Sequence, residues 1–370
     1  MAHQQDLFAS PKPHTHAKLR ILRDYLSAWT SILSNQSWVD ELTYVDAFAF
    51  KGILKAGLRD DSTSEYGSPL VALDIFERQA IKRTNKTFNI LCFEEKEKYY
   101  RELVNNLDLN FPKPKTNIVL EKGEFFNYLS GNGGNIELNS PIFTFLDPNG
   151  VRGIPASLTR KLLNIPNSEI FVNLMSGFIR RFVSVPSFQR HLVNTFDNQE
   201  AVNRIMGSNN RVEALIREYM KLLKSFGNIY VKYFEIQTRK GNTLFHLFFA
   251  TSNVTGFKIM KDVMWNISTE EGYIFCDASS HNRLLLSKDQ LLLLDSRLKN
   301  EVLDYVRRFN VVKVSSLYKH INQESEYFTE NHARRMLKEL EETRIVYIDR
   351  QSESKKIPSS ASVRLVVNEY

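Results

Sequence analysis

The sequence contains very little cysteine, with only Cys92 and Cys276 among its 370 residues. Each cysteine lies within an apolar run, as the buried thiols of β-strands do. Two isolated cysteines argue against a disulfide-stabilised scaffold and a thiolate metal centre, so we expect no metal site and a reducing, cytoplasmic compartment. The sequence also lacks a run of about eighteen apolar residues and therefore predicts no membrane-spanning helix.

Common catalytic signatures are missing as well. The chain has no Gly-x-Ser-x-Gly elbow, no phosphate-loop lysine motif and no His-Glu-x-x-His pair, which argues against the enzyme classes that these motifs identify. His246 lies in an apolar run, and we interpret it as a hydrogen-bonded core histidine rather than a catalytic base. The polar segment 1–16 lacks the apolar stretch of a secretory signal, and we expect it to be disordered.

The composition is that of a globular protein with a core, since 42% of the residues are hydrophobic and 25% are charged. The formal net charge is +7 and the isoelectric point is about 9.1. An excess of basic over acidic residues favours a phosphate-bearing partner such as a nucleic acid. An ordinary solvated basic surface is the alternative.

Short apolar runs alternate with amphipathic helical patterns from residue 17 to residue 294. The predicted strands are 42–46, 88–93, 117–120, 141–146, 169–175, 228–238 and 244–251. Helical spacing predicts a first helix over 18–33 and a later one over 256–265. This alternation is typical of an α/β fold of the Rossmann-like type, a mostly parallel sheet with helices on both faces. Its ligands bind beyond the carboxyl ends of the strands.

The region 295–370 has a different pattern and predicts a second, small domain. A first helix is followed by a short helix over 314–321, which we expect Ser315 to cap, and by a third over 331–340, which we expect Thr329 to cap. Two alternating runs near the end predict a two-stranded hairpin. Three short helices followed by a two-stranded wing are typical of a winged helix-turn-helix domain.

Acidic and glycine residues follow the first three predicted strands of the sheet. A nucleoside cofactor needs a tight first loop, an acid after the second strand for the ribose hydroxyls, and a polar group after the third near the base. Acids also end strands simply because they cap the helix that follows. The predicted cofactor-binding residues are Asp46, Phe48 and Gly52 in the first loop, Glu94 and Glu95 after the second strand, and Glu124 after the third.

Several segments of the chain, spread over residues 16–266, resemble the three-Cys-motif partner protein family. They are Lys18 with the helix to Leu33, the segments 44–52, 67–70, 93–95, 145–150 and 247–251, and Gly256 with 260–265. The resemblance implies a class I methyltransferase-like fold. It also implies S-adenosylmethionine as the cofactor and a radical-enzyme-like protein as a partner.

The first loop differs from the pattern of that family. Where the family has Asp-Gly-Phe-Ala-Gly, this chain has Asp46-Ala-Phe-Ala-Phe50. A phenylalanine at position 50 fills space that the amino-acid arm of the cofactor would use. Two functions therefore stay open: a methyltransferase-like protein that acts on nucleic acid, and a non-methylating partner subunit whose cofactor cleft is degenerate.

The loop after the fourth strand reads Asp147-Pro148-Asn149-Gly150. It resembles the Asp-Pro-Pro-aromatic loop of methyltransferases that act on the amino group of adenine. The second proline and the aromatic residue are replaced here, and the same four residues also form a good turn. We expect Asp147, Pro148 and Asn149 to face the substrate as catalytic residues.

Basic residues in three regions predict contact with nucleic acid, and one of these regions is the loop of the predicted wing with Arg350, Lys355 and Lys356. Arg180 and Arg181 follow the fifth strand, close to the expected cleft. The third helix of the tail carries Asn331, His332, Arg334, Arg335 and Lys338 on its polar side, as a groove-reading helix does. The tail is only slightly positive, so docking of a protein is the alternative.

Overall fold

The computed structural model describes residues 13–55, 65–132, 141–148, 153–179, 185–238, 240–268, 274–276, 288–325, 328–350 and 356–366. The helices are α1 (Pro13–Leu33), α2 (Ser68–Lys82), α3 (Glu97–Asn110), α4 (Phe125–Asn127), α5 (Ala156–Leu163), α7 (Pro186–Phe196), α8 (Gln199–Met206), α9 (Arg211–Lys224), α10 (Val254–Ile267), α11 (Lys288–Phe309), α12 (Val314–Gln323) and α13 (Glu330–Glu342). A π-helical turn covers Tyr128–Asn132 and a 3-10 turn covers Ser176–Phe178. None of the described helices is long and apolar enough to span a bilayer.

The central feature is an eight-stranded sheet in the order β10-β8-β9-β7-β6-β1-β4-β5. Its strands are β1 (Glu41–Asp46), β4 (Thr87–Glu94), β5 (Asn117–Lys122), β6 (Ile142–Leu146), β7 (Ser168–Leu174), β8 (Tyr230–Gln237), β9 (Thr243–Thr251) and β10 (Ile274–Cys276). Strand β9 is antiparallel to both of its neighbours, and the other pairs of the sheet are parallel. Apart from the added edge strand β10, this is the Rossmann-like order of class I methyltransferases, as the α/β prediction expects.

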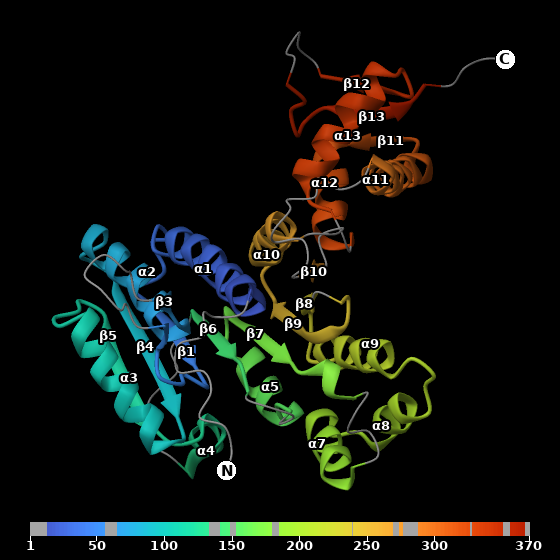
Figure 1. Cartoon of the computed structure of the whole chain (residues 1–370). Helices are drawn as coiled ribbons and strands as arrows, with labels where there is room; N and C mark the ends of the chain where they lie inside the picture. Colours follow the sequence, from blue (N-terminus) through green and yellow to red (C-terminus); the bar gives the residue numbers. More distant parts are fainter. Residues whose placement is uncertain are drawn as a thin grey trace.

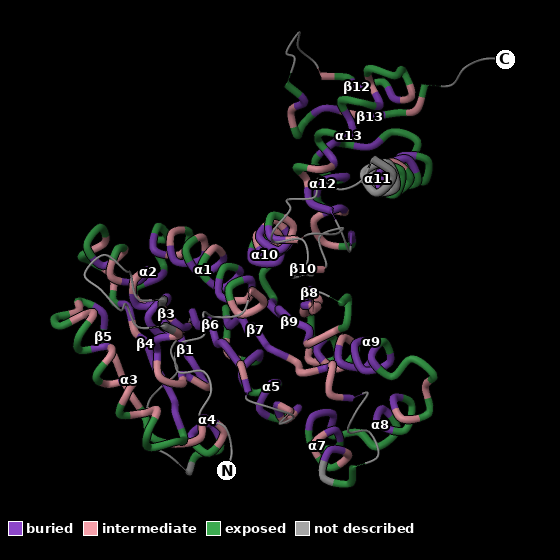
Figure 2. Tube along the Cα trace, viewed as in Figure 1, coloured by how far each residue is buried: buried purple, intermediate pink, exposed green. Residues whose placement is uncertain are grey.

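Helices cover both faces of this sheet (Figure 1). One face packs against α1, α2, α3 and α10, and the other packs against α4, α5, α7, α8 and α9. Buried residues follow the strands and the inner sides of the helices (Figure 2). Alternate residues of β1 enter opposite cores, with Tyr44 in the first and Val45 in the second. The parallel strands β1, β4, β5, β6 and β7 end at one edge of the sheet, whereas the antiparallel β9 ends at the opposite edge.

The ends of some elements differ from the predictions. Helix α1 begins at Pro13 instead of Lys18, so residues 13–16, predicted as part of a disordered lead, are helical. Proline suits the first turn of a helix, and the ring of His14 meets Phe245 edge-on at 6.2 Å. Residues 1–12 lie outside the described chain. Helix α5 and the hairpin of β2 (Ile53–Lys55) and β3 (Glu65–Tyr66) were not predicted.

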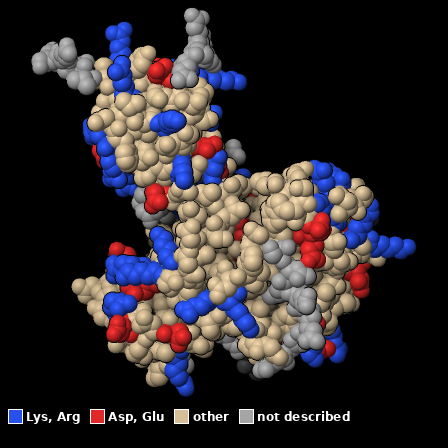
Figure 3. Space-filling view, turned by 180° about the vertical axis from the view of Figure 1, so that it is seen from behind, with Lys and Arg blue, Asp and Glu red and all other residues tan. Residues whose placement is uncertain are grey.

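The C-terminal unit contains α11, α12, α13 and a three-stranded antiparallel sheet in the order β11-β13-β12. Its strands are β11 (Val311–Lys313), β12 (Val346–Asp349) and β13 (Ser362–Leu365). The unit has a hydrophobic core of its own. Helix α11 begins at Lys288 and so crosses the boundary predicted at residue 295. Seen from behind, the unit projects from the α/β body and carries Lys and Arg side chains (Figure 3).

Two predicted helix caps had different outcomes. Thr329 caps α13 as predicted, and its backbone N–H donates to Nδ1 of His332 at 3.1 Å. The prediction that Ser315 caps α12 is wrong, because α12 begins at Val314, so that Ser315 lies in its first turn and Lys313 is at its cap. Strand β11 leads directly into α12, and the N–H groups of Val314 and Ser315 donate to the carbonyls of Ala361 and Ser359 at 2.8 and 3.0 Å in place of a side-chain cap.

Helix α10 joins the C-terminal unit to the α/β body through a buried lysine. Lys261 Nζ donates to the backbone oxygens of four residues at 2.7 to 3.1 Å. These acceptors are Ile321, Asn322, Ser325 and Phe328. Asp262, next to Lys261, accepts from the hydroxyl of Thr329 at 2.8 Å. Because these partners belong to the end of α12 and to the segment that leads into α13, the C-terminal unit is fixed to α10.

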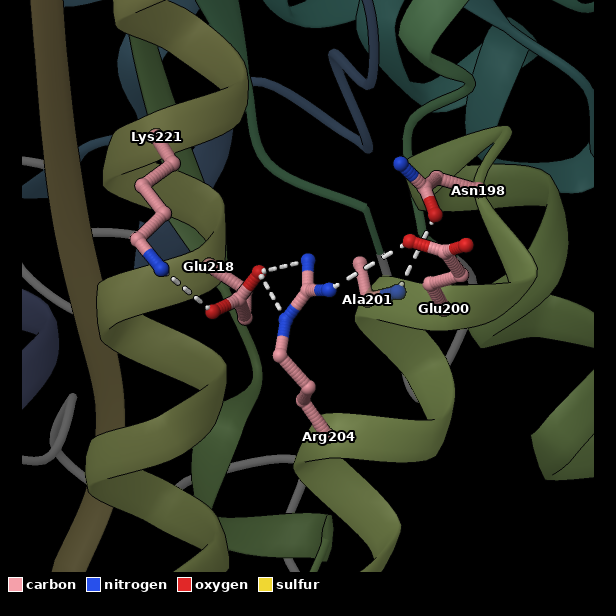
Figure 4. Close-up of polar contacts among 6 residues, drawn as sticks. All are labelled: Asn198, Glu200, Ala201, Arg204, Glu218 and Lys221. Atoms are coloured by element: carbon pink, nitrogen blue, oxygen red, sulfur yellow. Dashed lines mark hydrogen bonds and ion pairs between the residues drawn. The ribbon is translucent and has the colours of Figure 1, made fainter.

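A second buried charge holds the helical layer beneath β8 and β9. The side chain of Glu218 on α9 is only 3% exposed. One of its oxygens accepts from Arg204 Nη2 of α8 at 2.7 Å, and the other accepts from Lys221 Nζ at 2.9 Å (Figure 4). The Arg204 hydrogen bond, followed by that of Lys221, lowers the pKa of Glu218. This carboxylate therefore stays charged inside the protein.

Candidate functional site

The loop that follows β1 is organised by Asp46. This side chain is fully buried, and its carboxylate accepts from Tyr44 Oη at 3.0 Å and from the Phe48 N–H at 3.3 Å. Burial raises the pKa of Asp46 to about 6, because a charge is poorly solvated there. Asp46 therefore lies beneath the loop and shapes it, and a ligand in the cavities described below would meet the loop backbone and Phe48 first.

Glu94, at the end of β4, fixes the same loop from the neighbouring strand. One carboxylate oxygen accepts from the Phe50 N–H at 3.0 Å, and the other accepts from the Lys96 N–H at 2.8 Å. The Ala49 N–H donates to the carbonyl of Phe93 at 2.9 Å. Glu94 thus joins the first loop to the start of α3, and each oxygen keeps a lone pair for a further donor.

Gly52 closes the loop at a place where only glycine fits. Its φ is +74°, and a Cβ at this position would lie 2.6 Å from Leu70 Cδ1 and 2.8 Å from Leu103 Cδ1. The Gly67 N–H donates to the Gly52 carbonyl at 2.7 Å, which draws the start of α2 onto the loop. The predicted role of Gly52 in a tight first loop has this physical basis.

Phe50 adopts a backbone conformation that glycine prefers. Its φ is +53°, where a side chain crowds the backbone. The ring packs against Tyr99 of α3 with centroids 4.3 Å apart. The family resemblance has glycine at this position, a residue that adopts a positive φ without such crowding. Such strain persists where the surrounding structure fixes it.

Three of the predicted acids line one cavity at the carboxyl ends of β1, β4 and β5. The cavity measures about 240 Å³, and Glu94, Glu95 and Glu124 lie on its wall. The rings of Phe48 and Phe126, 5.8 Å apart, belong to the same wall. The remaining lining residues are Ala47, Phe93, Lys96, Gly123 and Phe125. The Phe50 ring is not part of this wall, and so it leaves the cavity open.

A second cavity, of about 140 Å³, adjoins the first loop on its other side. Phe48 lines both cavities, and Phe50, Gly52, Lys18 and Asp147 line only the second. This second cavity lies between the ends of β1 and β6, which is the point where the order of the sheet reverses. Ligands of open α/β sheets bind at such reversal points.

Asp147 is held between two partners at the edge of this second cavity. Lys18 Nζ of α1 donates to its Oδ2 in a salt bridge, and Asn173 Nδ2 of β7 donates to its Oδ1 at 2.6 Å. The Lys18 side chain is 12% exposed and that of Asp147 is 23% exposed. Both carboxylate oxygens are thus engaged, although each keeps one lone pair. Pro148 is buried beside them.

Sequence reasoning missed some of the residues in this region. The sequence pattern places Asn173 within an apolar strand and does not mark it as a site residue, although a buried amide near the end of a strand is itself a signal of a polar site. Phe126 and Lys96 were also not selected, because aromatic and basic residues after strands carry no specific pattern. Asn149, Arg180 and Arg181, which were predicted as site residues, lie outside the described residues.

His246 is a buried core histidine, as interpreted. Its Nδ1 is 2.6 Å from Ser176 Oγ, and its Nε2 is 3.8 Å from Glu235 Oε2. Burial lowers the pKa of His246 to about 4, so the ring is neutral near pH 7. Ser176 is only 1% exposed, which closes this serine–histidine pair to a substrate.

Four of the five polar residues selected on α13 share one exposed stripe. Asn331, Arg334, Arg335 and Lys338 follow a spacing of three, four and seven residues, and all are exposed. His332 does not belong to this stripe. Its ring lies 4.4 Å from that of Trp265 of α10, and burial lowers its pKa to about 4. Whether the stripe binds nucleic acid stays a prediction.

Comparison with known proteins gives only distant similarities. No protein-family model matches the chain, and no curated protein sequence matches it. An O-methyltransferase from Bacillus cereus solved in complex with SAH is 11% identical, with 66% of this chain and 94% of that chain covered at a TM-score of 0.32. A candidate O-methyltransferase from Klebsiella pneumoniae is also 11% identical, with coverages of 66% and 91% and a TM-score of 0.33. A candidate S-adenosyl-L-methionine-dependent methyltransferase from Methanococcus maripaludis is 11% identical, with coverages of 68% and 98% and a TM-score of 0.29. These similarities are weak, and the class I methyltransferase-like fold follows from the strand order itself.

Proposed function

We propose that this protein binds S-adenosylmethionine at the carboxyl edge of its sheet and acts as a methyltransferase-like protein on nucleic acid. The observation that carries the proposal is the 240 Å³ cavity whose wall brings together Glu94 at the end of β4, Glu95 just after it, and Glu124 in the loop after β5. Carboxylates in this position accept from the hydroxyls of a ribose. The rings of Phe48 and Phe126 supply flat apolar walls for a base.

The residues present fit both halves of such a cofactor. The 240 Å³ cavity has the carboxylates and rings that a nucleoside needs, and the adjoining 140 Å³ cavity accepts an amino-acid arm beside Phe48 and Gly52. The chemistry that the cofactor supplies when bound is an electrophilic methyl group. Asp46 and Glu94 hold the loop between the two cavities, and Lys18 with Asn173 orients Asp147 at the edge of the second.

A nucleic-acid substrate is supported by the basic stripe on α13 and by the net charge of +7. The C-terminal unit has three helices and a three-stranded sheet, and we assign it as a winged helix-turn-helix domain. The start of α13 is packed against α10 through His332 and Trp265. Arg334, Arg335 and Lys338 lie further along the helix, where phosphate groups are reachable.

A second function is favoured by the loop after β6. Both oxygens of Asp147 are engaged by Lys18 and Asn173, which weakens its case as an acceptor for a substrate amine. In this second function the chain is the non-methylating partner subunit of a radical-enzyme-like protein, as the three-Cys-motif partner resemblance implies. The C-terminal unit then recruits that protein or a nucleic acid.

Calorimetry with S-adenosylmethionine and S-adenosylhomocysteine separates the two functions. We expect binding in the parent protein and at least a tenfold loss in Glu95→Gln and Glu124→Gln, since one hydrogen bond to a charged group contributes about 1.5–3 kcal/mol. The matched control is Glu97→Gln, which removes an exposed carboxylate of α3 that does not line the cavity. No heat with either compound would leave only the second function.

Fluorescence anisotropy with labelled duplex and single-stranded oligonucleotides tests the substrate class. We expect salt-dependent binding whose slope falls by about two when Arg334 and Lys338 are both changed to Gln. Arg307→Gln with Lys313→Gln is the control, because it removes two charges from α11 and β11 of the same unit. Equal losses in the two double variants, or no binding, would contradict a role for the stripe.

A further inference from the structure

A third cavity, of about 230 Å³, is separate from the two cavities at the carboxyl edge of the sheet. It is formed where α1, the start of α10 and the start of β7 come together. Helices α1 and α10 lie side by side on one face of the sheet (Figure 1). Glu169 at the amino end of β7 lines this cavity, whereas Asn173, near the carboxyl end of the same strand, contacts Asp147. The cavity is therefore at the edge opposite the proposed cofactor site.

The inner end of this cavity holds a buried carboxyl group. Glu169 is 3% exposed, and its oxygens accept from Tyr25 Oη at 2.6 Å and from Thr251 Oγ1 at 2.9 Å. Gly256 allows α10 to approach it, since a Cβ there would lie 2.4 Å from Glu169 Oε1. Each oxygen keeps a lone pair for one more donor.

No cation of the described residues neutralises Glu169. Among the described residues that line the cavity there is no Lys, Arg or His, and Tyr25 is the only other ionisable side chain. Burial raises the pKa of Glu169 to about 7. Glu218 offers a direct comparison, because it is buried to the same degree and has both Arg204 and Lys221 as partners. Among the described residues, Glu169 thus lacks the cationic partners that Glu218 has.

The outer part of the cavity has the rings that attract organic cations. Trp29 is buried on α1, while Trp38 is 55% exposed and Ile32 is 38% exposed at the mouth. Indole faces attract ammonium groups, and this attraction adds to that of a carboxylate. An anion would be repelled by Glu169. A neutral apolar molecule would leave the remaining lone pairs of the Glu169 carboxylate without a donor.

We propose that this cavity binds a small organic cation, a primary or methylated ammonium on an apolar or aromatic skeleton. Its charge meets Glu169, and its skeleton lies against Trp29 and Trp38. The site is independent of the proposed function, because it shares no residue with the cavities at the carboxyl edge.

The three tryptophans of the chain make the test direct, since two of them line the cavity and the third is Trp265. In a Trp265→Phe background, tryptophan fluorescence is titrated with 2-phenylethylammonium, neutral 2-phenylethanol and anionic 3-phenylpropionate. We expect saturable quenching by the ammonium, with an affinity at least tenfold above that of the alcohol, and none by the carboxylate. The affinity for the ammonium should rise from pH 6 to pH 8 as Glu169 loses its proton.

Variants identify the residues responsible. Glu169→Gln should remove the preference for the ammonium over the alcohol and its pH dependence, and Trp38→Ala, which truncates an exposed side chain, should weaken binding at least threefold. Glu41→Gln is the matched control, because Glu41 lies at the same edge of the sheet outside this cavity. The absence of saturable quenching at millimolar ammonium, equal affinities for all three probes, or an unchanged preference in Glu169→Gln would overturn the proposal.

Discussion

Lys18 of the first helix forms a salt bridge with Asp147 of the loop after β6, across 129 positions of the sequence. Both side chains are mostly shielded from water, and Asn173 completes the arrangement. The pair thus fixes α1 against the edge of the sheet where the two cavities lie. Both residues also line the second cavity, so the same salt bridge stabilises the packing of α1 and sets the geometry of the candidate site.

Breaking this pair from either side should cost stability. We expect Lys18→Met and Asp147→Asn each to lower the free energy of unfolding by about 1–3 kcal/mol, since each leaves a shielded polar group without its partner. The double variant should lose less than the sum of the two, with a coupling energy of about 1 kcal/mol or more. Urea unfolding followed by tryptophan fluorescence measures all four proteins. Strict additivity would show that the pair does not interact in solution.

Removing the Phe50 ring should improve the fit of the cofactor. In Phe50→Gly the positive φ is no longer strained, while the contact with Tyr99 is lost. We expect the affinity for S-adenosylmethionine to rise severalfold and the affinity for adenosine, which lacks the amino-acid arm, to stay the same. Calorimetry with both ligands measures this. Phe48→Gly is the comparison, and because Phe48 lines both cavities, it should weaken both ligands.

Much of the fold was predictable from local pattern. Strands such as 88–93 and 141–146 are apolar apart from Asn89 and Thr144, as a sheet covered on both faces requires. The Thr329 cap of α13 was also predictable, because a helix cap depends on the capping residue and its neighbours in the sequence. Helix α5 was missed because its pattern is short and its charged residues interrupt the apolar positions.

The candidate site was predictable only in part. That Glu94, Glu95 and Glu124 meet follows from the parallel strands before them, since carboxyl ends share one edge. The burial of Asp46 and the bridge from Lys18 to Asp147 do not follow, because both depend on how the first helix and the loop pack in three dimensions. Glu169 gave no signal either, as its environment comes from α1 and α10, which are far away in sequence.

The buried acids Asp46 and Glu169 should make stability depend on pH. Burial raises their pKa values to about 6 and about 7, above the ordinary values of 3.8 and 4.5. The folded state therefore favours the protonated forms, and this stabilisation is complete below about pH 4 and lost as the pH rises through 6 to 7. We expect each acid to lower the free energy of unfolding on the order of 1–3 kcal/mol across this window.

Amide variants isolate these two contributions. Asp46→Asn and Glu169→Gln cannot titrate, so each should flatten the curve of unfolding free energy against pH between 5 and 8. Urea unfolding at four pH values measures the curves. Glu41→Gln, at the edge of the same sheet, should leave the slope as it is. Curves of Glu169→Gln and the parent that run parallel would contradict the assignment.

The carboxylate of Glu218 should matter far more than that of Glu200, although both are near Arg204. Glu218→Gln removes a buried charge from between two cations, and we expect a loss of about 1–3 kcal/mol. Glu200 is 87% exposed and 3.8 Å from Arg204, so Glu200→Gln should change stability by about 0.5 kcal/mol or less. Urea unfolding compares them, and similar losses would show that the buried hydrogen bonds are weak.

Lys261 should hold the C-terminal unit in place. Lys261→Met leaves four buried carbonyls without their donor, and we expect a loss of about 2–4 kcal/mol. Hydrogen exchange should rise in α12 and at the start of α13, because Lys261 binds the end of α12 and the segment before α13, while β1 and β4 stay protected. Lys258→Met is the control, since its ion pair with Glu330 is about one-quarter exposed and worth about 1 kcal/mol or less. A uniform rise in exchange over the whole chain, or an equal rise in the control, would mean that Lys261 stabilises the body of the protein rather than this junction.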